Sequence, residues 1–308
     1  MSFLHLYISY TKILSLGSDA DVRLSVNEGY FRKSRSGKLR TFEQALSLCA
    51  DGGFDTIDVG FSSLEPELNP ILSPDYISKV YHMRDICDKL NMVPDQSHAP
   101  FIFNNLSSDD IRTQLERCVE ASAVLGVKNI VVHADTYYEK DFDFDRALNV
   151  IYEVYAPIVE SAVKNGIKIA METLFEDRVP NGKRARFTSC LEELEAIVGK
   201  FSDESVGICW DFGHARVVYG DKQFEQMKRV GSKIIATHVH DNIGSKDLHQ
   251  MPYFGGTNWE EAMSTLKGIG YKGSFTLELV YGCIPDELLP DYIKLFHKTG
   301  MYMLEHAN

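Results

Sequence analysis

The sequence lacks several features that would place it in a specialised class. No window approaches the ~18 uninterrupted apolar residues of a membrane span, so we expect no membrane partner. The apolar stretch FLHLYISYTKILSL is interrupted by His5 and Lys12 and has no basic segment or cleavage site around it, which disfavours a signal peptide. No Pro/Gly/Ser-rich linker divides the 308 residues, and 44% of them are apolar, so a single domain is predicted over residues 1–308.

An excess of positive charge is also missing. Lys and Arg number 32 against 44 Asp and Glu, which gives a formal charge of −12. A protein that binds nucleic acid through its phosphates needs clustered Lys and Arg to displace counterions. We therefore expect no nucleic-acid partner.

The cysteines form no closely spaced motif. They are widely scattered, and several fall within apolar patterns that are typical of reduced core thiols. This usage predicts a cytoplasmic protein. The six residues are Cys49, Cys87, Cys118, Cys190, Cys209 and Cys283.

Short β-branched, apolar runs alternate with longer helical patterns along the chain. Helix starts are indicated by a capping box at Thr41 and Gln44 and by Ser73 followed by Pro74. Glycines just before the next strand, as in DGGFDTID and KNGIKIAM, are typical of helix C-caps. The sequence predicts eight strands, at 12–17, 54–61, 92–98, 129–135, 167–174, 206–214, 234–241 and 274–280.

Eight strand–helix units in one chain of this length favour a (β/α)8 barrel, for which ~250 residues is typical. A doubly wound open sheet is the alternative. It usually carries a glycine-rich phosphate-binding turn after its first strand, and SLGSDADV supplies no G-x-G-x-x-G. The predicted fold is therefore an α/β TIM barrel in a single domain.

Ionisable residues end six successive predicted strands. In a TIM barrel, alternate strand residues point inward and functional groups lie at the C-terminal strand ends. Burying several unpaired charges in one cavity is unfavourable, and a bound cation would offset the cost. Carboxylates and imidazoles without a cysteine suit Mn²⁺, Mg²⁺, Co²⁺ or Zn²⁺. The residues are His98, His133, Glu172, Asp211 with His214, His238 with His240, and Glu278.

The chain resembles a known family along almost its whole length. The motifs SHAP, VVHAD, METL, WDFGHA, HVHDN and LELV are similar to those of the sugar isomerases and epimerases among the xylose-isomerase-like TIM barrels. That family includes tagatose and psicose 3-epimerases, hydroxypyruvate isomerase and inosose dehydratase, and it is related to the apurinic endonucleases. The resemblance implies a small sugar or sugar derivative as substrate and association into homo-oligomers. It also implies one divalent metal ion, with Mn²⁺ the first expectation and Mg²⁺, Co²⁺ or Zn²⁺ as alternatives.

The resemblance further assigns site residues. It implies Glu172, Asp211, His240 and Glu278 as metal ligands, with Glu172 and Glu278 also acting as catalytic acid and base. Two positions depart from the epimerase pattern, because Arg178 and Lys246 stand where those enzymes have a substrate-binding Glu and an Arg. The expected substrate-binding residues are His98, His133, His214, His238, Arg178, Lys246, Asp247 and His249.

These residues fit more than one reaction. An isomerase or epimerase would remove a proton next to a carbonyl and return it through an enediolate stabilised by the cation. A lyase, either a dehydratase or a C-glycoside-cleaving enzyme, would use the same residues to expel a β-substituent. Asp247 and His249 form a D-x-H that resembles a metal-binding motif of apurinic endonucleases, so a metallo-hydrolase is the third alternative. A non-catalytic sugar-binding barrel is disfavoured because all four expected ligands are present.

Overall fold

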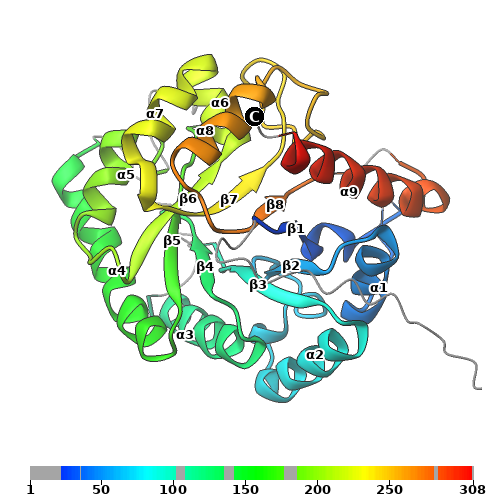
Figure 1. Ribbon diagram of the computed structural model, residues 1–308. Helices are drawn as coiled ribbons and strands as arrows, with labels where there is room; N and C mark the ends of the chain where they lie inside the picture. The colour runs from blue at the N-terminus through cyan, green and yellow to red at the C-terminus, as the bar shows by residue number, and fades with distance from the viewer. Residues whose placement is uncertain are drawn as a thin grey trace, which may run out of the picture.

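Eight parallel strands close into a barrel in the computed structural model, which describes residues 22–34, 36–101, 108–134, 142–176, 186–280 and 284–306. Each strand pairs with the next, and the last pairs with the first. Parallel neighbours require crossover connections, and the helices of these crossovers form the outer ring in Figure 1. The predicted TIM barrel is confirmed. The strands are β1 (Leu24–Asn27), β2 (Thr56–Gly60), β3 (Val93–His98), β4 (Asn129–Val132), β5 (Lys168–Glu172), β6 (Val206–Asp211), β7 (Ile234–Val239) and β8 (Phe275–Leu277).

The helical elements follow the strands in regular order, and short 3-10 turns accompany several of them. The α-helices are α1 (Phe42–Gly52), α2 (Tyr76–Leu90), α3 (Ser108–Leu125), α4 (Phe144–Lys164), α5 (Leu191–Val198), α6 (Phe212–Tyr219), α7 (Gln223–Val230), α8 (Trp259–Gly268) and α9 (Leu289–Glu305). The 3-10 turns are η1 (Glu28–Phe31), η2 (Pro70–Leu72), η3 (Gly220–Lys222), η4 (Gly231–Lys233) and η5 (Asp286–Leu288). None of the helices within the described residues is long and apolar enough to cross a bilayer.

Local sequence signals account for several helix boundaries. The capping box of α1 is confirmed, with Thr41 and Gln44 each bonding the other's backbone N–H. Gly53 ends this helix at φ 107°, a left-handed conformation that glycine adopts without steric cost. The predicted N-cap of α2 at Ser73 is wrong by two residues. Asp75 holds that position, and the Ser73 hydroxyl donates a hydrogen bond to its carboxylate.

The prediction of the first barrel strand at 12–17 is wrong in position. Residues 12–17 lie outside the described part of the chain, and Leu24–Asn27 occupies the place between β8 and β2. This strand has only four residues, and the polar Ser25 and Asn27 are as deeply buried as its two apolar residues. Its sequence, LSVN, alternates apolar and polar residues over four positions only and contains no continuous apolar run. The predicted strand at 206–214 is also too long, because β6 ends at Asp211 and α6 begins directly after it at Phe212.

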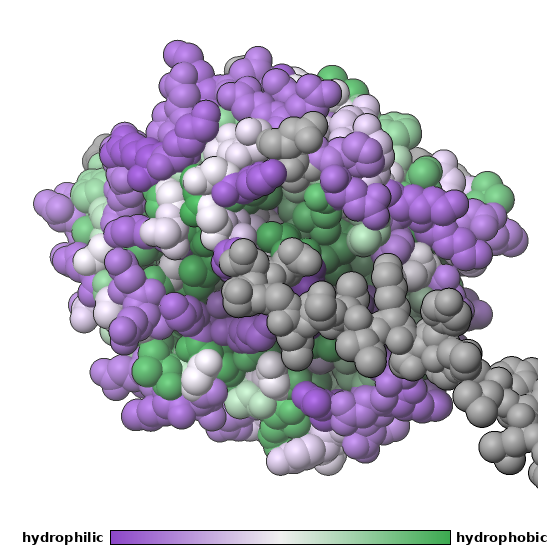
Figure 2. Space-filling model, viewed as in Figure 1, coloured by the Kyte–Doolittle hydropathy of each residue, from purple (hydrophilic) through white to green (hydrophobic). Residues whose placement is uncertain are grey.

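Two layers of side chains pack the barrel. The larger core lies between the strands and the helices. A small second cluster of Val131, Ala170, Cys209 and Ala236, from β4 to β7, fills the inner face of the strands. Above it, at the C-terminal strand ends, the inner side chains become ionisable. The outer edge of the molecule, where the helices face the solvent, is mostly hydrophilic in the view of Figure 2.

Candidate metal centre and active site

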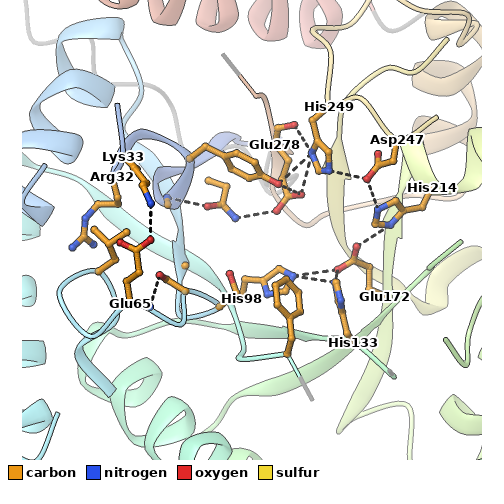
Figure 3. A pocket seen from close by; sticks show the side chains of 18 of the residues that line it. Arg32, Lys33, Glu65, His98, His133, Glu172, His214, Asp247, His249 and Glu278 are labelled. Carbon is orange, nitrogen blue, oxygen red and sulfur yellow. Dashed lines mark hydrogen bonds and ion pairs between the residues drawn. The ribbon is translucent and has the colours of Figure 1, made fainter. Parts of the chain in front are cut away.

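The ionisable strand ends meet in one pocket of about 450 Å³. This volume falls within the ~300–1,000 Å³ of small-molecule sites. Figure 3 shows His214, Asp247 and His249 at one end and Arg32, Lys33 and Glu65 at the other. The strand-end residues that line the pocket are His98, His133, Glu172 and His214, together with Glu278 after β8.

The D-x-x-H spacing of WDFGHA places Asp211 and His214 through a helix start. Asp211 ends β6 and is the N-cap of α6, where its Oδ1 accepts a hydrogen bond from the backbone N–H of His214 at 2.6 Å. This cap turns the His214 ring back over the carboxylate, with Nδ1 3.6 Å from Asp211 Oδ2. The burial of both residues is therefore a consequence of the strand running straight into the helix.

The motif HVHDN combines site residues with residues that hold the following loop. Asp241 is fully buried and accepts hydrogen bonds from the backbone N–H of Gly255 and Thr257 and from the Trp259 indole at 2.8 Å. Asn242 accepts a hydrogen bond from the Leu248 N–H. The loop between β7 and α8 is thus fixed from both ends. It carries Asp247 and His249 into the pocket, where Asp247 Oδ2 lies 3.2 Å from His249 Nε2.

Glu172 is surrounded by imidazoles. Its Oε2 lies 2.9 Å from His133 Nε2 and 3.5 Å from His98 Nε2, and its Oε1 lies 3.1 Å from His214 Nδ1. Burial alone would raise the pKa of Glu172, but charges on His133 and His238 hold it well below its usual value. Glu172 is therefore ionised, with imidazole rings close to both of its oxygens.

Glu278 has a different environment, made largely of neutral donors. Asn27 at the end of β1 donates to Oε1 at 2.9 Å, and the Tyr30 hydroxyl donates to Oε2 at 3.4 Å. Burial raises the pKa of Tyr30 well above its usual value, so the phenol keeps its proton. The two oxygens of Glu278 thus differ, with Oε1 held by β1 and Oε2 by η1.

The two histidines of β7 and its end face different partners. His238 Nδ1 lies 3.4 Å from Glu172 and 3.9 Å from Asp211, and its Nε2 lies 3.6 Å from Glu278. His240 contacts only Asp211 of these three carboxylates, at 3.0 Å, and its ring stacks on His249. His238 is therefore the β7 histidine that lies nearest the centre of the three carboxylates.

The donor set fits a divalent cation. His238 Nδ1 and His240 Nδ1 are buried nitrogens without a hydrogen-bond partner among the described residues, and an orphaned donor of this kind suits a metal ligand. Several sets of side-chain atoms converge closely enough to hold an ion; all supply oxygen and nitrogen, and one also contains the sulfur of Cys209. They are His98, His133 and Glu172; Glu172, Asp211 and His214; His98, His238 and Glu278; Glu172, Cys209 and His238; and His214, His240, Asp247 and His249.

Residues 46–298 match the family model described as the xylose isomerase-like TIM barrel. The chain belongs to this family. Its curated relatives include two uncharacterized proteins. The protein y4fM of Sinorhizobium fredii is 27% identical over 61% of this chain and 63% of its own length, so the match spans less than two thirds of that relative. MJ1311 of Methanocaldococcus jannaschii is 29% identical over 74% of this chain and 78% of its own length.

Solved structures of the xylose isomerase-like fold superpose over nearly the whole chain. A D-tagatose 3-epimerase-like protein gives a TM-score of 0.70 at 23% identity and covers 92% of this chain and 98% of its own. A D-psicose 3-epimerase determined with D-fructose gives 0.72 at 15% identity, with 92% and 99% covered. The IolI protein with a bound zinc atom gives 0.71 at 20% identity, with 93% and 99% covered. At these identities the likeness establishes the fold alone.

The barrel of this xylose isomerase-like protein gathers most of the residues that the sequence predicted for the site. Lys246 is an exception, because it is exposed and does not line the pocket. Arg178 lies outside the described residues. From the basic loop after β5, Arg186 lines the pocket, and from the segment after β1, Tyr30, Arg32 and Lys33 do so.

Four polar residues that contact the site were missed from the sequence. Asn27 and Tyr30 hold Glu278, while Asp58 of β2 and Gln96 of β3 lie beneath His238. A signal for two of them was present, since Asp58 interrupts the apolar run FDTIDVGF and Gln96 interrupts MVPDQSH. Alternate residues of a barrel strand face the interior, so a polar residue two or more positions before the strand end can lie beneath the strand-end groups.

Proposed function

We propose that this xylose isomerase-like barrel is a divalent-metal-dependent isomerase or epimerase of a small sugar or sugar derivative. One observation carries the proposal. Glu172 and Glu278, from strands three apart in the ring, both reach the pocket with Asp211 and a buried imidazole among them. This oxygen and nitrogen set suits a hard or borderline divalent ion.

The roles follow from the contacts of each residue. Glu172, Asp211 and Glu278 would hold the ion together with a β7 histidine, either His240, as the resemblance implies, or His238, which the distances favour. A bound ion would supply Lewis-acid stabilisation of the enediolate charge. Glu172 and Glu278 would remove and return the proton at the carbon next to the carbonyl.

The remaining polar groups of the pocket would bind the substrate. His98, His133 and His214 have ring nitrogens at the pocket wall, and a neutral or charged imidazole can donate hydrogen bonds to sugar hydroxyls. Asp247 and His249 line the same end of the pocket. A sugar lying along these residues would have its carbonyl near Glu172 and Glu278. The cytoplasmic location and the association into homo-oligomers stay predictions.

The decisive experiment measures metal content and proton exchange together. Elemental analysis of protein purified without chelator should give about one Mn, Co, Mg or Zn per chain, with less in Glu278→Gln. The control is Glu193→Gln, which changes a buried carboxyl on α5 that does not line the pocket. Aldoses and ketoses are then incubated in D2O, and deuterium at the carbon next to the carbonyl is followed by NMR.

Each outcome assigns a reaction. Deuterium exchange that accompanies formation of a rearranged sugar supports the isomerase or epimerase. Deuterium exchange that accompanies loss of water or of an aglycone indicates a lyase instead. Absence of metal, even after incubation with these ions, would overturn the mechanism.

A second candidate is a polynuclear metallo-hydrolase of the apurinic endonuclease type. The observation in its favour is that two further sets of potential ligands lie in the same site, one of which shares Glu172 with the central carboxylates. One contains His98, His133 and Glu172, and the other contains His214, His240, Asp247 and His249. Against it stands the formal charge of −12, which opposes binding to a phosphate backbone. Two or three zinc ions per chain, together with nicking of abasic DNA at physiological salt, would favour this candidate.

A further inference from the structure

The pocket residues Asp247 and His249 lie on the loop between β7 and α8, and a buried asparagine at the start of this loop holds both of them. Asn242 is fully buried and does not line the pocket. The residues between it and Asp247, 243–246, are all exposed to solvent. An exposed segment has little packing of its own, so the anchors at its ends determine where Asp247 lies.

The Asn242 side chain makes hydrogen bonds in two directions. Its Oδ1 accepts from the backbone N–H of Leu248, and its Nδ2 donates to the carbonyl of Gly213 at 2.9 Å. The same Nδ2 lies 3.4 Å from Asp247 Oδ1. A backbone N–H can only donate and a carbonyl can only accept, so these two partners fix the orientation of the amide. One side chain therefore ties the loop to the first turn of α6.

The first turn of α6 also places two residues of the site. Gly213 lies between Asp211, the N-cap of α6, and His214. Asp247 Oδ2 lies 3.5 Å from His214 Nε2 and 3.2 Å from His249 Nε2, and these three residues lie together at one end of the pocket (Figure 3). Asp247 therefore bridges an imidazole of the helix and an imidazole of the loop. This arrangement requires the loop to keep its distance from α6.

The backbone of His249 is in the left-handed region, with φ 45°. Residues other than glycine adopt this region infrequently, and they keep it only where the surrounding structure holds them there. The next residue, Gln250, exchanges two backbone hydrogen bonds with Asp241, at 2.7 and 3.0 Å, and the preceding residue, Leu248, is held by the amide described above. In this conformation the His249 ring stacks on His240, with 3.8 Å between the ring centroids. Release of Leu248 would allow His249 to relax and its ring to leave the stack.

We propose that Asn242 is a positioning residue for substrate binding: by joining the loop to α6, it keeps Asp247 between His214 and His249. The inference rests on the sugar-binding function proposed above for this pocket. It adds that part of the affinity for the substrate depends on a side chain that lies outside the pocket and acts through the loop.

The proposed ion site should be affected little by the loss of this amide. Among the described residues, the Asn242 side chain makes its hydrogen bonds to the loop and to the start of α6, and none to the carboxylates proposed to hold the ion. Its removal should therefore weaken substrate binding while the affinity for the ion stays nearly the same.

The first test observes the imidazoles directly and needs neither substrate nor metal. The metal-free full chain is labelled with 15N-histidine, and long-range 1H–15N spectra are recorded for the wild type and Asn242→Ala. The ring signals of His214 and His249 should shift in the variant, whereas those of His98, which ends β3, should not. Hydrogen exchange at the Leu248 amide should become about 10-fold faster or more, because its acceptor is removed.

The second test uses the sugar identified by the deuterium screen. In Asn242→Ala the KM should rise about 10-fold with a smaller change in kcat, and the Mn²⁺ dissociation constant should stay within about twofold of the wild type. Asn242→Asp has nearly the same size and is the second variant if Asn242→Ala fails to fold. It keeps an oxygen for the Leu248 N–H but loses the donor to the Gly213 carbonyl, so exchange at Leu248 should stay slow while the histidine signals still shift.

The matched control is Asn258→Ala. Asn258 lies at the other end of the same loop, where it is the N-cap of α8 and its Oδ1 accepts a hydrogen bond from the Glu261 N–H at 3.2 Å. Its replacement removes a side-chain hydrogen bond of the same kind far along the loop from Asp247. The signals of His214 and His249 and the KM should keep their wild-type values, even if the thermal midpoint falls.

Two results would overturn the inference. One is a folded Asn242→Ala protein with wild-type histidine signals and a wild-type KM, and the other is an equal shift of the signals in Asn258→Ala, which would indicate general loosening of the loop. A chain that binds no divalent ion and exchanges no sugar rejects the proposed function instead. In that case the histidine spectra alone decide whether Asn242 holds the loop in place.

Discussion

The carboxyl of Glu28, the first residue of η1, lies 3.8 Å from the guanidinium of Arg32 at the C-cap of this turn, measured from Oε2 to Nη1, and both side chains are buried. Neither Glu28 oxygen makes a hydrogen bond of ordinary length within the described residues. Burial raises the pKa of Glu28 to about 7, because it outweighs the opposing charge of Arg32. This carboxyl therefore ionises near neutral pH in the folded protein.

The raised pKa predicts a loss of stability between pH 5 and pH 8. The unfolded chain releases this proton near the ordinary value of 4.5, whereas the folded chain keeps it to about 7, so the free energy of unfolding falls as the pH rises through this range. The full effect is about 3 kcal/mol at 1.36 kcal/mol per unit. Glu28→Gln stays neutral at every pH. Its thermal midpoint, relative to that of the wild type, should therefore be higher at pH 8 than at pH 5. The control is Glu116→Gln, which changes an exposed carboxyl of α3; its thermal midpoint relative to the wild type should be the same at pH 5 and pH 8. An equal change with pH in both variants would contradict the prediction.

Tyr30→Phe should lower turnover with little change in metal affinity. The hydroxyl contacts Glu278 Oε2 at 3.4 Å and His249 Nδ1 at 3.2 Å and lines the pocket. A hydrogen bond to a charged group contributes ~1.5–3 kcal/mol, so kcat should fall about 10-fold or more once a substrate is known. Steady-state kinetics and Mn²⁺ titration separate the two effects. Tyr253→Phe, at an exposed ring, is the control, and a Tyr30→Phe enzyme with wild-type kcat would remove this residue from the mechanism.

His249→Gln distinguishes one metal ion from several. His249 belongs to the group with His214, His240 and Asp247 and lies outside the central carboxylates. With a single central ion, the metal content per chain should be unchanged and substrate binding weakened. With a polynuclear centre, the content should fall by about one ion. Elemental analysis of the wild type and the variant, purified side by side, gives the answer.

Gly213→Ala should damage the site through the His240 ring. A Cβ built on Gly213 would lie 1.8 Å from His240 Cε1, so the ring would have to move. Overpacking of this kind typically costs ~1–3 kcal/mol. Chemical denaturation should show that loss, and metal affinity should fall with it. Gly268→Ala meets nothing within 4 Å and should be neutral or slightly stabilising, and equal behaviour of the two variants would count against the predicted clash.

The alternation of apolar runs and helical patterns was enough to predict the barrel and seven of its strands. The prediction of the remaining strand, β1, failed for a physical reason. Residues 24–27 pair on both sides with neighbouring strands, yet two of these four residues are polar and face the crowded interior. Hydrophobicity therefore favoured the more apolar segment at 12–17. Only closure of the ring, a non-local property, identifies the true first strand.

The strand-end residues were predicted because a TIM barrel places its chemistry at one edge. The contacts of each individual residue were harder to predict. His238 and His240 share a face by spacing alone, and only the structure shows that one faces three carboxylates while the other stacks on His249. Asp58 and Gln96 lie lower in the barrel, where inward-facing polar groups become meaningful only once their histidine neighbour is known.

The hydrogen bond from Asn27 to Glu278 joins residues that are 251 positions apart. It spans the seam at which the first and last strands of the ring meet. Glu278 directly follows β8, so it is synthesised after all eight strands and after the histidines at the strand ends. An ion held jointly by Glu172, Asp211 and Glu278, as proposed above, would therefore find its full ligand set only after the first and last strands of the ring have paired.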